Sequence, residues 1–366
     1  MKILMLVNWK VSYNDKDAAK GKQPPDYYIK GEHYWFFRYF KEIPQVDVID
    51  ISSFPWLEKF EREKLRFYVW QTLRAIPKLN QYDLVISHGM QSAVVLSLLR
   101  CLFKTKAKHL VFEIGSFNSA ATEGGALKLM QFASKSIDDF IYHTSKQIEY
   151  YREYFPWIVS KAHFMCYGAD TSFFTPMEEC ENKELKEILC IGYRKRDWNT
   201  LLKSFDSLCD SEIGQKYKLQ LKLIGKIDLQ VKNEKVVLLP YIPIEELKKE
   251  IAKAAICVVP LEDFNYSFGQ MTLLQQMAME KAVIVAKVPS VIDYVTENET
   301  ALFYESGNEQ DLCDKMSYLL ENQDLCCVIA KKASAAVKTV YSEERMAEDI
   351  EKVIKMMMEH TIIDID

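Results

Sequence analysis

Residues 255–287 contain residue types that could bind a phosphate group. Ser267, Gly269 and Thr272 lie between two apolar runs, at a turn that leads into a helical pattern. The first four N–H groups of a helix have no partner within the helix, and the macrodipole adds partial positive charge there. Gly269 would let the backbone approach a ligand closely, and the two hydroxyls add hydrogen-bonding groups. The turn therefore predicts an anion site, although many helices begin after Gly and Ser without binding anything.

A second stretch, residues 188–202, carries two arginines directly after an apolar run. Gly192 ends the run, and Arg194 and Arg196 precede a helical pattern that contains Thr200. Guanidinium groups fit phosphate oxygens in a two-pronged geometry and can neutralise charge that develops on a leaving group. We therefore expect both arginines beside a diphosphate; an exposed basic turn is the alternative.

The order of these motifs resembles glycosyltransferase family 4 (glycosyl transferases group 1), the retaining, nucleotide-sugar-dependent enzymes with the GT-B fold. Its pattern of strand, Pro, acidic loop, Gly turn and apolar helix is matched by Pro260, Gly269, Leu273, Leu274, Met277, Ala278, Lys281 and Val283 to Val285. The segments 200–202 and 239–247 and the hinge-like stretch 167–176 extend the match. The resemblance covers essentially the second half of the chain and is weaker in the first.

The resemblance implies a UDP- or GDP-sugar donor, held mainly by the second half of the chain. The implied donor-binding residues are Gly31, Gly192, Lys226, Tyr241, Ser267, Gly269, Gln270, Met271, Thr272 and Gln275. Gln275 stands where the family usually has the second glutamate of its E-x7-E motif, which bonds the ribose; a glutamine keeps an acceptor and adds a donor. The first glutamate has no obvious counterpart, because counting back from Gln275 gives Ser267. For Lys226, a solvated lysine is the alternative.

The resemblance also implies how sugar transfer would proceed. Arg196 and Arg194 would stabilise the departing diphosphate, and the leaving phosphate would itself help to deprotonate the acceptor, so no protein nucleophile is required. Many members have a histidine near the transferred sugar, after the strand that ends at Glu113 in this chain. That histidine is absent, so we expect Glu113 or Ser116 to line the acceptor site, together with His88, which ends the preceding strand.

Short apolar runs separated by helical patterns must position these residues. The expected strands are Ile3–Val7, Val46–Ile51, Leu84–His88, Leu110–Ile114, Phe140–Thr144, His163–Tyr167, Ile188–Gly192, Leu219–Ile224, Val236–Leu239, Ile256–Val259, Val283–Ala286 and Leu302–Tyr304. Short runs without alternation are typical of parallel strands covered on both faces, and such sheets bind ligands at the carboxyl ends of their strands. We expect an α/β protein of GT-B type, with two Rossmann-like doubly wound domains facing each other across a cleft.

The polar, turn-rich stretch 171–187 marks the expected domain boundary. Residues 1–170 would form the acceptor-side domain and residues 171–340 the nucleotide-sugar-binding domain. Residues 341–366 would contain a terminal helix over 342–360, with Ser342 as its N-cap. In the resembled fold, such a helix crosses back to the N-terminal domain.

Charge and composition limit the possible locations and partners. Residues 1–170 carry 23 Lys and Arg against 18 Asp and Glu, and the remaining residues carry 24 against 34. No basic stripe indicates nucleic-acid binding. The N-terminal run is too short for a signal peptide, and no apolar run is long enough to span a membrane, so a cytoplasmic protein is expected. The oligomeric state cannot be predicted.

The stretch Trp56–Arg74 has a charged, aromatic-rich helical pattern, which predicts peripheral contact with the inner face of the cytoplasmic membrane or simple packing on the sheet. The resemblance implies a glycan or lipid-linked glycan acceptor, in surface polysaccharide or glycoconjugate biosynthesis. It also implies turnover without a metal or cofactor, and the D-x-D pairs at 15–17 and 364–366 are poorly placed for one. Two other functions remain open: a GT-B sugar-nucleotide epimerase or hydrolase, and a non-catalytic GT-B subunit that partners an active enzyme.

Overall fold

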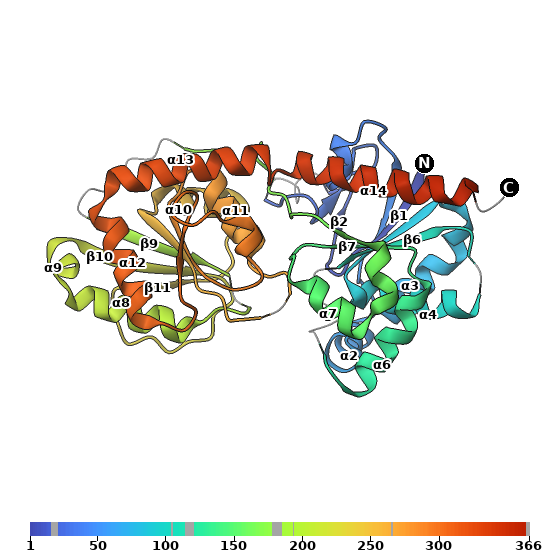
Figure 1. Ribbon diagram of the computed structural model, residues 1–366, viewed down its shortest axis with the longest axis horizontal. Helices are drawn as coiled ribbons and strands as arrows, with labels where there is room; N and C mark the ends of the chain where they lie inside the picture. The colour runs from blue at the N-terminus through green and yellow to red at the C-terminus, as the bar shows by residue number, and fades with distance from the viewer. Residues whose placement is uncertain are drawn as a thin grey trace. The chain divides into compact units, whose positions relative to one another are not determined.

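The chain forms two compact units. The computed structural model describes residues 1–15, 21–103, 105–113, 121–177, 185–192, 194–264 and 266–363. The first unit comprises residues up to Met165, the loop residues Tyr266 and Ser267, and the C-terminal segment from Met346; the second comprises Cys166–Phe264 and Phe268–Arg345. Each unit contains a parallel six-stranded sheet with helices packed against it (Figure 1).

The first unit has the strand order β4-β1-β5-β6-β7-β8, with a separate two-stranded pair, β2-β3. Its strands are β1 (Lys2–Leu6), β2 (Ser12–Tyr13), β3 (Tyr27–Tyr28), β4 (Gln45–Ile49), β5 (Leu84–His88), β6 (Lys108–Glu113), β7 (Asp139–Tyr142) and β8 (Ala162–Phe164). Its helices are η1 (Trp35–Tyr39), α2 (Pro55–Phe60), η2 (Glu61–Leu65), α3 (Val69–Ala75), η3 (Ile76–Gln81), α4 (Met90–Leu102), α6 (Gly124–Ala133), η4 (Ser134–Ser136), α7 (Gln147–Tyr154), η5 (Pro156–Lys161) and most of α14 (Glu343–Ile363).

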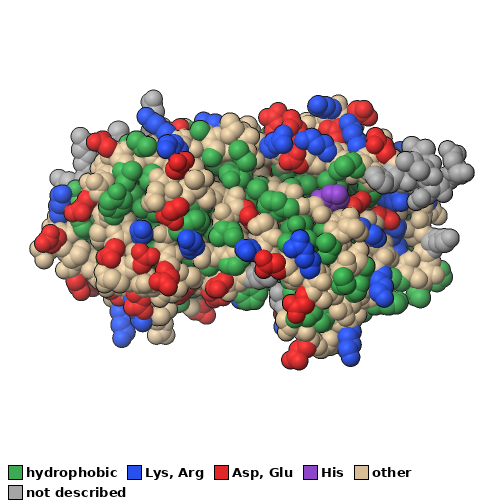
Figure 2. All heavy atoms as spheres, in the orientation of Figure 1, with side chains coloured by type: hydrophobic (Ala, Val, Ile, Leu, Met, Phe, Trp, Pro, Cys, Tyr) green, Lys and Arg blue, Asp and Glu red, His purple; other side chains and the backbone are tan. Residues whose placement is uncertain are grey.

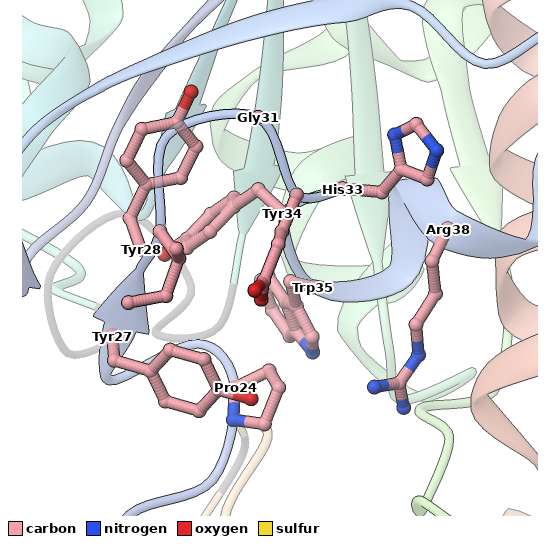
Figure 3. A pocket seen from close by; sticks show the side chains of 10 residues that line it. Pro24, Tyr27, Tyr28, Gly31, His33, Tyr34, Trp35 and Arg38 are labelled. Carbon is pink, nitrogen blue, oxygen red and sulfur yellow. The ribbon is translucent and has the colours of Figure 1, made fainter. Parts of the chain in front are cut away.

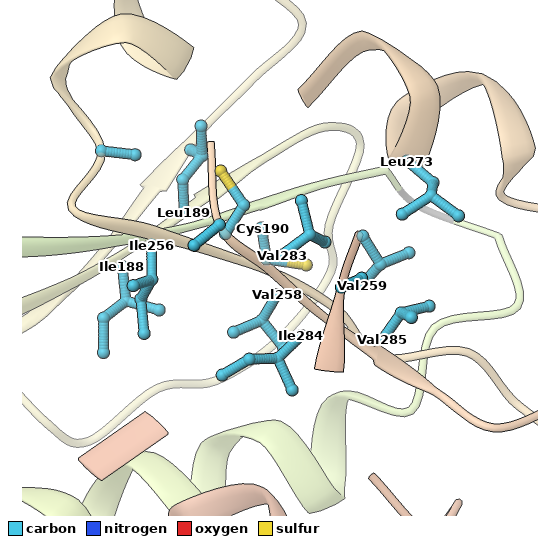
Figure 4. Packing of buried hydrophobic residues seen from close by; sticks show 14 of the residues in the cluster. Ile188, Leu189, Cys190, Ile256, Val258, Val259, Leu273, Val283, Ile284 and Val285 are labelled. Atoms are coloured by element: carbon cyan, nitrogen blue, oxygen red, sulfur yellow. The ribbon is translucent and has the colours of Figure 1, made fainter. Parts of the chain in front are cut away.

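The second unit has the strand order β11-β10-β9-β12-β13-β14. Its strands are β9 (Leu185–Ile191), β10 (Lys218–Ile224), β11 (Val236–Leu239), β12 (Ile256–Val259), β13 (Val283–Ala286) and β14 (Leu302–Tyr304). Its helices are α8 (Trp198–Asp210), α9 (Glu212–Lys216), α10 (Ile244–Lys253), α11 (Gln270–Ala278), η6 (Ile292–Tyr294), α12 (Glu309–Glu321) and α13 (Gln323–Thr339). Figure 4 shows side chains of β9, β12 and β13 packed together with Leu273 of α11.

The twelve strands expected from the apolar runs are all present, and the two doubly wound sheets confirm the expected α/β class. The central strands are buried along their length because helices cover both faces of the sheet, which is why their residues do not alternate in polarity. On the face shown in Figure 2, acidic and basic side chains are interspersed. Among the described residues, no helix is both long and apolar enough to cross a membrane.

The expectation of one continuous helical pattern over 56–74 is wrong. The stretch divides into α2, a π-helical turn η2 and α3, with Arg66 in the left-handed region (φ 61°) between the last two. The buried carboxylate of Glu61 accepts the backbone N–H of Trp70 at 2.8 Å, at the start of α3. A side chain that satisfies the free N–H of a new helix favours a break over continuation.

The segment after Gly31 contains a short 3₁₀ helix, η1, which begins at Trp35. The φ of Trp35 is 46°, which is unusual for a bulky residue. Gly31 itself has a φ of 93°.

The terminal helix α14 begins one residue after Ser342, as the sequence predicts. The Ser342 hydroxyl accepts the backbone N–H of Arg345 at 3.1 Å, which is an N-cap bond. Further along, the Glu351 carboxylate accepts the backbone N–H groups of Lys41 and Glu42 at 3.1 and 3.4 Å. These bonds attach α14 to the segment between η1 and β4.

Replacing the cap should weaken this helix. We expect Ser342→Ala to lower the free energy of unfolding by about 1 kcal/mol, because one N–H of the first turn loses its partner. Ser342→Asp keeps an acceptor and should retain most of the stability. Urea unfolding of the three proteins measures the difference; equal midpoints for Ser342→Ala and the parent would contradict the capping role.

Candidate functional site

The carboxyl ends of β9 and β12 are the most informative place in the second unit. These two strands are neighbours, and the order of strands along the sheet reverses between them. At such a point the loops leave in opposite directions and open a crevice where α/β proteins bind ligands. The loop 192–197 follows β9, and the loop 260–269 follows β12. The two motifs singled out from the sequence therefore meet at one edge of one sheet.

Two glycines let adjacent loops touch through their backbones. Gly192 follows β9 with a φ of 129°, and its N–H donates to the Ile224 carbonyl at 2.9 Å. Gly225 follows β10 with a φ of 153°, and a Cβ there would overlap the Gly192 carbonyl. A Cβ at Gly192 would lie 2.6 Å from Nη2 of Arg196. Neither position can accept a side chain without moving its neighbour.

Arg196 fills the space beneath the Gly192 loop. Its side chain is buried, and each of its nitrogens donates a hydrogen bond within the protein. Nε and Nη2 donate to the Ile191 carbonyl at 3.3 and 3.1 Å, and Nη1 donates to the Arg194 carbonyl at 3.2 Å. Nη2 also donates to Oγ1 of Thr272 at 3.0 Å. One guanidinium thus joins the end of β9, its own loop and the first turn of α11.

The charge of Arg196 has no acidic counterpart among the described residues. The partners of its hydrogen bonds are carbonyls and a hydroxyl, and the carboxylate of neighbouring Asp197 instead caps α8, accepting the N–H of Thr200 at 3.0 Å. Burial lowers the pKa of Arg196, and Cys190 and nearby tyrosines offset this only in part. Buried charges in proteins are normally paired. A cation held here by neutral groups favours an anion nearby.

The first turn of α11 adds N–H groups to the same edge of the sheet. Gly269 is the N-cap residue, and Thr272 donates its hydroxyl to the Gly269 carbonyl at 3.0 Å. Gln270 is buried, with Nε2 donating to the Ser290 carbonyl at 2.6 Å, so its side chain holds a neighbouring loop. Met271 is exposed. Among Gly269, Gln270, Met271 and Thr272, the side chains of Gln270 and Thr272 form hydrogen bonds within the protein.

The other donor-side residues differ in exposure. Lys226, Tyr241 and Arg194 are exposed and follow β10, β11 and β9 respectively, on the same edge of the sheet as Gly192. Gln275 is buried in α11. Sequence reasoning missed its neighbour Gln276, which is fully buried and whose amide has no partner among the described residues. The sequence could not identify Gln276, because a glutamine is an ordinary residue and only its burial is unusual.

Ser267 is grouped with the first unit and not with the turn that follows it. Its hydroxyl lies 3.2 Å from Oγ1 of Thr144, and it also donates to Oε1 of Gln147 at 3.5 Å. Gln147 is the first residue of α7 and is fully buried. Within the first unit, Ser267 is therefore held at the start of α7.

Gly31 lines a pocket of about 420 Å³ in the first unit. Tyr27, Tyr28, Tyr34 and Trp35 bring their rings to one side of it, and Arg38 extends its guanidinium along the other (Figure 3). The volume falls in the range of small-molecule sites. Tyr27 and Tyr28 form β3, Trp35 begins η1, and Tyr34 directly precedes it. The apolar runs of the sequence did not predict β3.

His88 ends β5 inside a set of aromatic rings. Its ring centroid lies 4.7 Å from Trp9 and 5.9 Å from both Trp35 and Phe112. Neither ring nitrogen has a hydrogen-bond partner among the described residues. Burial lowers the pKa of His88 to about 3, with a smaller contribution from His143. His88 is therefore a neutral imidazole at physiological pH.

The remaining predicted residues are less accessible. Glu113 is buried at the end of β6, beside Tyr142 of β7. Ser116 lies outside the described residues. No group of three or more His, Cys, Asp or Glu side chains suited to a metal ion occurs in the part of the chain that the structure describes.

Comparison with known families gives a match over the same region. The sequence model of the family described as "Glycosyl transferases group 1" matches residues 186–322, which run from the second residue of β9 to the end of α12. This range contains every predicted donor-side residue except Gly31. No curated protein sequence gives a significant match.

Solved structures resemble the chain over almost its whole length. A sucrose-phosphate synthase from Thermosynechococcus elongatus has a TM-score of 0.73 at 16% identity, covering 98% of this chain and 100% of that chain. The fold is GT-B. HepE from Anabaena, solved in complex with UDP and with UDP-glucose, gives 0.68 at 12% identity, covering 97% and 100%. A glycosyltransferase from Rickettsia africae gives 0.67 at 14% identity, covering 98% of each chain.

The neutral state of His88 makes this GT-B protein sensitive to acid. In the unfolded chain a histidine has a pKa near 6.5, so between about pH 3 and 6.5 the unfolded state binds more protons at this position and stability falls as the pH falls. At pH 5 the loss from His88 should be about 2 kcal/mol relative to neutral pH. We expect His88→Phe to remove that part of the pH dependence.

Urea unfolding of both proteins at pH 7 and pH 5 measures this effect. The control is His33→Gln, at an exposed position, which should keep the pH dependence of the parent. Parallel pH profiles for His88→Phe and the parent would contradict a buried, neutral imidazole at position 88.

Proposed function

We propose that this protein is a retaining glycosyltransferase that moves a sugar from a UDP- or GDP-sugar to a glycan or lipid-linked glycan acceptor. The second unit holds the donor, and the acceptor is bound by the first. The biological setting consistent with this is surface polysaccharide or glycoconjugate biosynthesis.

The observation that carries the proposal is the buried guanidinium of Arg196 at the point where the strand order reverses. Among the described residues it is bonded only to neutral groups, and it lies beside the N-terminus of α11, where free N–H groups favour an anion. Arg194 and Lys226 add exposed cations on the same edge of the sheet. A diphosphate satisfies all of these groups together. The family match over residues 186–322 and the UDP bound by HepE support a nucleoside diphosphate as that anion.

The roles of the two arginines differ. Arg196 is a positioning residue, because its donors already bond the Gly192 loop and Thr272. Arg194 is exposed and is the residue that reaches the diphosphate. In the reaction, the bond from the anomeric carbon to the phosphate oxygen breaks, and the bond to the acceptor oxygen forms on the same face. The acceptor proton passes to the departing phosphate, whose charge the cations stabilise.

Binding measurements separate these two roles. Arg194→Ala should weaken UDP or GDP binding by about 1.5–3 kcal/mol, the usual value for a hydrogen bond to a charged group, and leave stability unchanged. Arg196→Ala should weaken binding and also lower the free energy of unfolding by on the order of 2 kcal/mol, because buried carbonyls lose their donor. Lys203→Ala, an exposed lysine paired with Glu309, is the control. Calorimetry showing parent-like affinity for Arg194→Ala would remove that residue from the site.

Turnover tests the reaction class and the role of metals. With a UDP- or GDP-sugar and an acceptor, we expect a glycoside that keeps the anomeric configuration of the donor, and activity that survives EDTA. An isomerised nucleotide sugar formed without acceptor would indicate an epimerase, and released sugar a hydrolase. Binding without turnover would indicate a non-catalytic subunit. Activity abolished by EDTA and restored by magnesium or manganese would contradict metal independence.

A further inference from the structure

The segment from Phe54 to Ile76 carries large apolar side chains on the surface of the first unit. Trp56, Phe54 and Phe60 are 70%, 55% and 47% exposed. Trp56 and Phe60 are four residues apart in α2, so they lie on the same side of that helix. Exposed apolar groups that gather in this way mark an interaction surface.

The apolar surface continues onto α3. The Phe54 ring lies 5.6 Å from that of Trp70, which joins the start of α2 to α3. Leu73 of α3 and Ile76, its C-cap residue, are 48% and 41% exposed. They follow Trp70 at intervals of three residues and so lie on one side of the helix. We call Phe54, Trp56, Phe60, Leu73 and Ile76 the apolar face.

The acidic residues within this segment are mostly turned inward. Glu58 is paired with Lys10 at 2.9 Å and is only 15% exposed at its side chain. Glu61 is buried and caps the start of α3. Glu63 is exposed, but lies 3.4 Å from Arg62. Of these three carboxylates, only that of Glu63 is exposed, and it is paired with a basic side chain.

The basic residues of the same segment point outward instead. Those that are exposed and form no ion pair with a described residue are Lys59, Lys64 and Arg66, and Lys78, two residues beyond the segment, is a fourth such cation. The surface therefore combines aromatic rings with a net positive charge. Lysine is depleted from protein–protein interfaces, whereas tryptophan and cations together suit the boundary between lipid and water.

We propose that the apolar face binds a phospholipid surface that carries anionic headgroups. The rings of Trp56 and Phe60 enter the interface, and the four surrounding cations are attracted to the lipid phosphates. The proposal does not depend on the transfer reaction, because none of these residues belongs to the candidate donor site. It places the first unit, which is proposed to bind the acceptor, at a lipid surface.

Flotation with vesicles tests the proposal without any nucleotide. The full-length protein should float with vesicles of phosphatidylcholine mixed with phosphatidylglycerol at low salt, and not with phosphatidylcholine alone. The double variant Trp56→Ser/Phe60→Ser should bind at least tenfold more weakly. Tyr318→Ser, at a position on α12 that is about as exposed as Phe60, is the matched control and should bind like the parent. Circular dichroism of each variant confirms that it is folded.

Two further variants distinguish insertion of the Trp56 ring into the lipid from attraction of the lysines to the headgroups. Brominated phospholipid should quench the fluorescence of the parent, and Trp56→Phe should retain binding but lose much of that quenching. Lys59→Glu/Lys64→Glu should abolish binding at low salt. Parent-like flotation of the double serine variant, equal binding to neutral vesicles, or the absence of any vesicle binding would each overturn the proposal; in the last case a protein partner would be the better occupant.

Discussion

The edge of the second unit that carries the candidate site depends on a single buried cation. Arg196 bonds the last carbonyl of β9, the carbonyl of Arg194 and the hydroxyl of Thr272, so the end of β9, the loop after it and the distant first turn of α11 share one donor group. The loops after parallel strands have no ladder bonds of their own, and something else must fix them. Here the Arg196 guanidinium both fixes the loops and carries the positive charge. A substitution of Arg196 would therefore change the geometry and the electrostatics of this edge together.

The strands and the two donor-side motifs could be predicted from the sequence, for physical reasons. Buried parallel strands are short apolar runs, and the run Leu84–His88 has the same limits in the structure. Likewise, a Gly before a helix is a local signal, and Gly269 is the N-cap of α11. Short buried strands and glycine caps depend only on residues that are close in sequence, so the sequence pattern is sufficient to predict them.

What could not be predicted depends on contacts between distant residues. Both arginines of the 192–197 loop have the same chemistry in sequence, yet Arg196 is buried and Arg194 is exposed. The composition of the 56–74 stretch favours one helix, but the carboxylate of Glu61 caps a second one. Gln276 and His88 are ordinary residues until burial deprives their polar atoms of partners among the described residues. To predict any of these features, one would need to know the direction of the side chain in the folded protein.

The close approach of Gly192 and Gly225 has a consequence for how this binding surface can change over evolutionary time. A side chain at either position would collide with the neighbouring loop or with Arg196, so both are closed to ordinary sequence drift. Tyr241 and Met271 are 63% and 51% exposed on the same edge of the sheet. If the proposed donor site is correct, new ligand preferences arise by exchange at these two positions, while the backbone of Gly192 and Gly225 stays fixed.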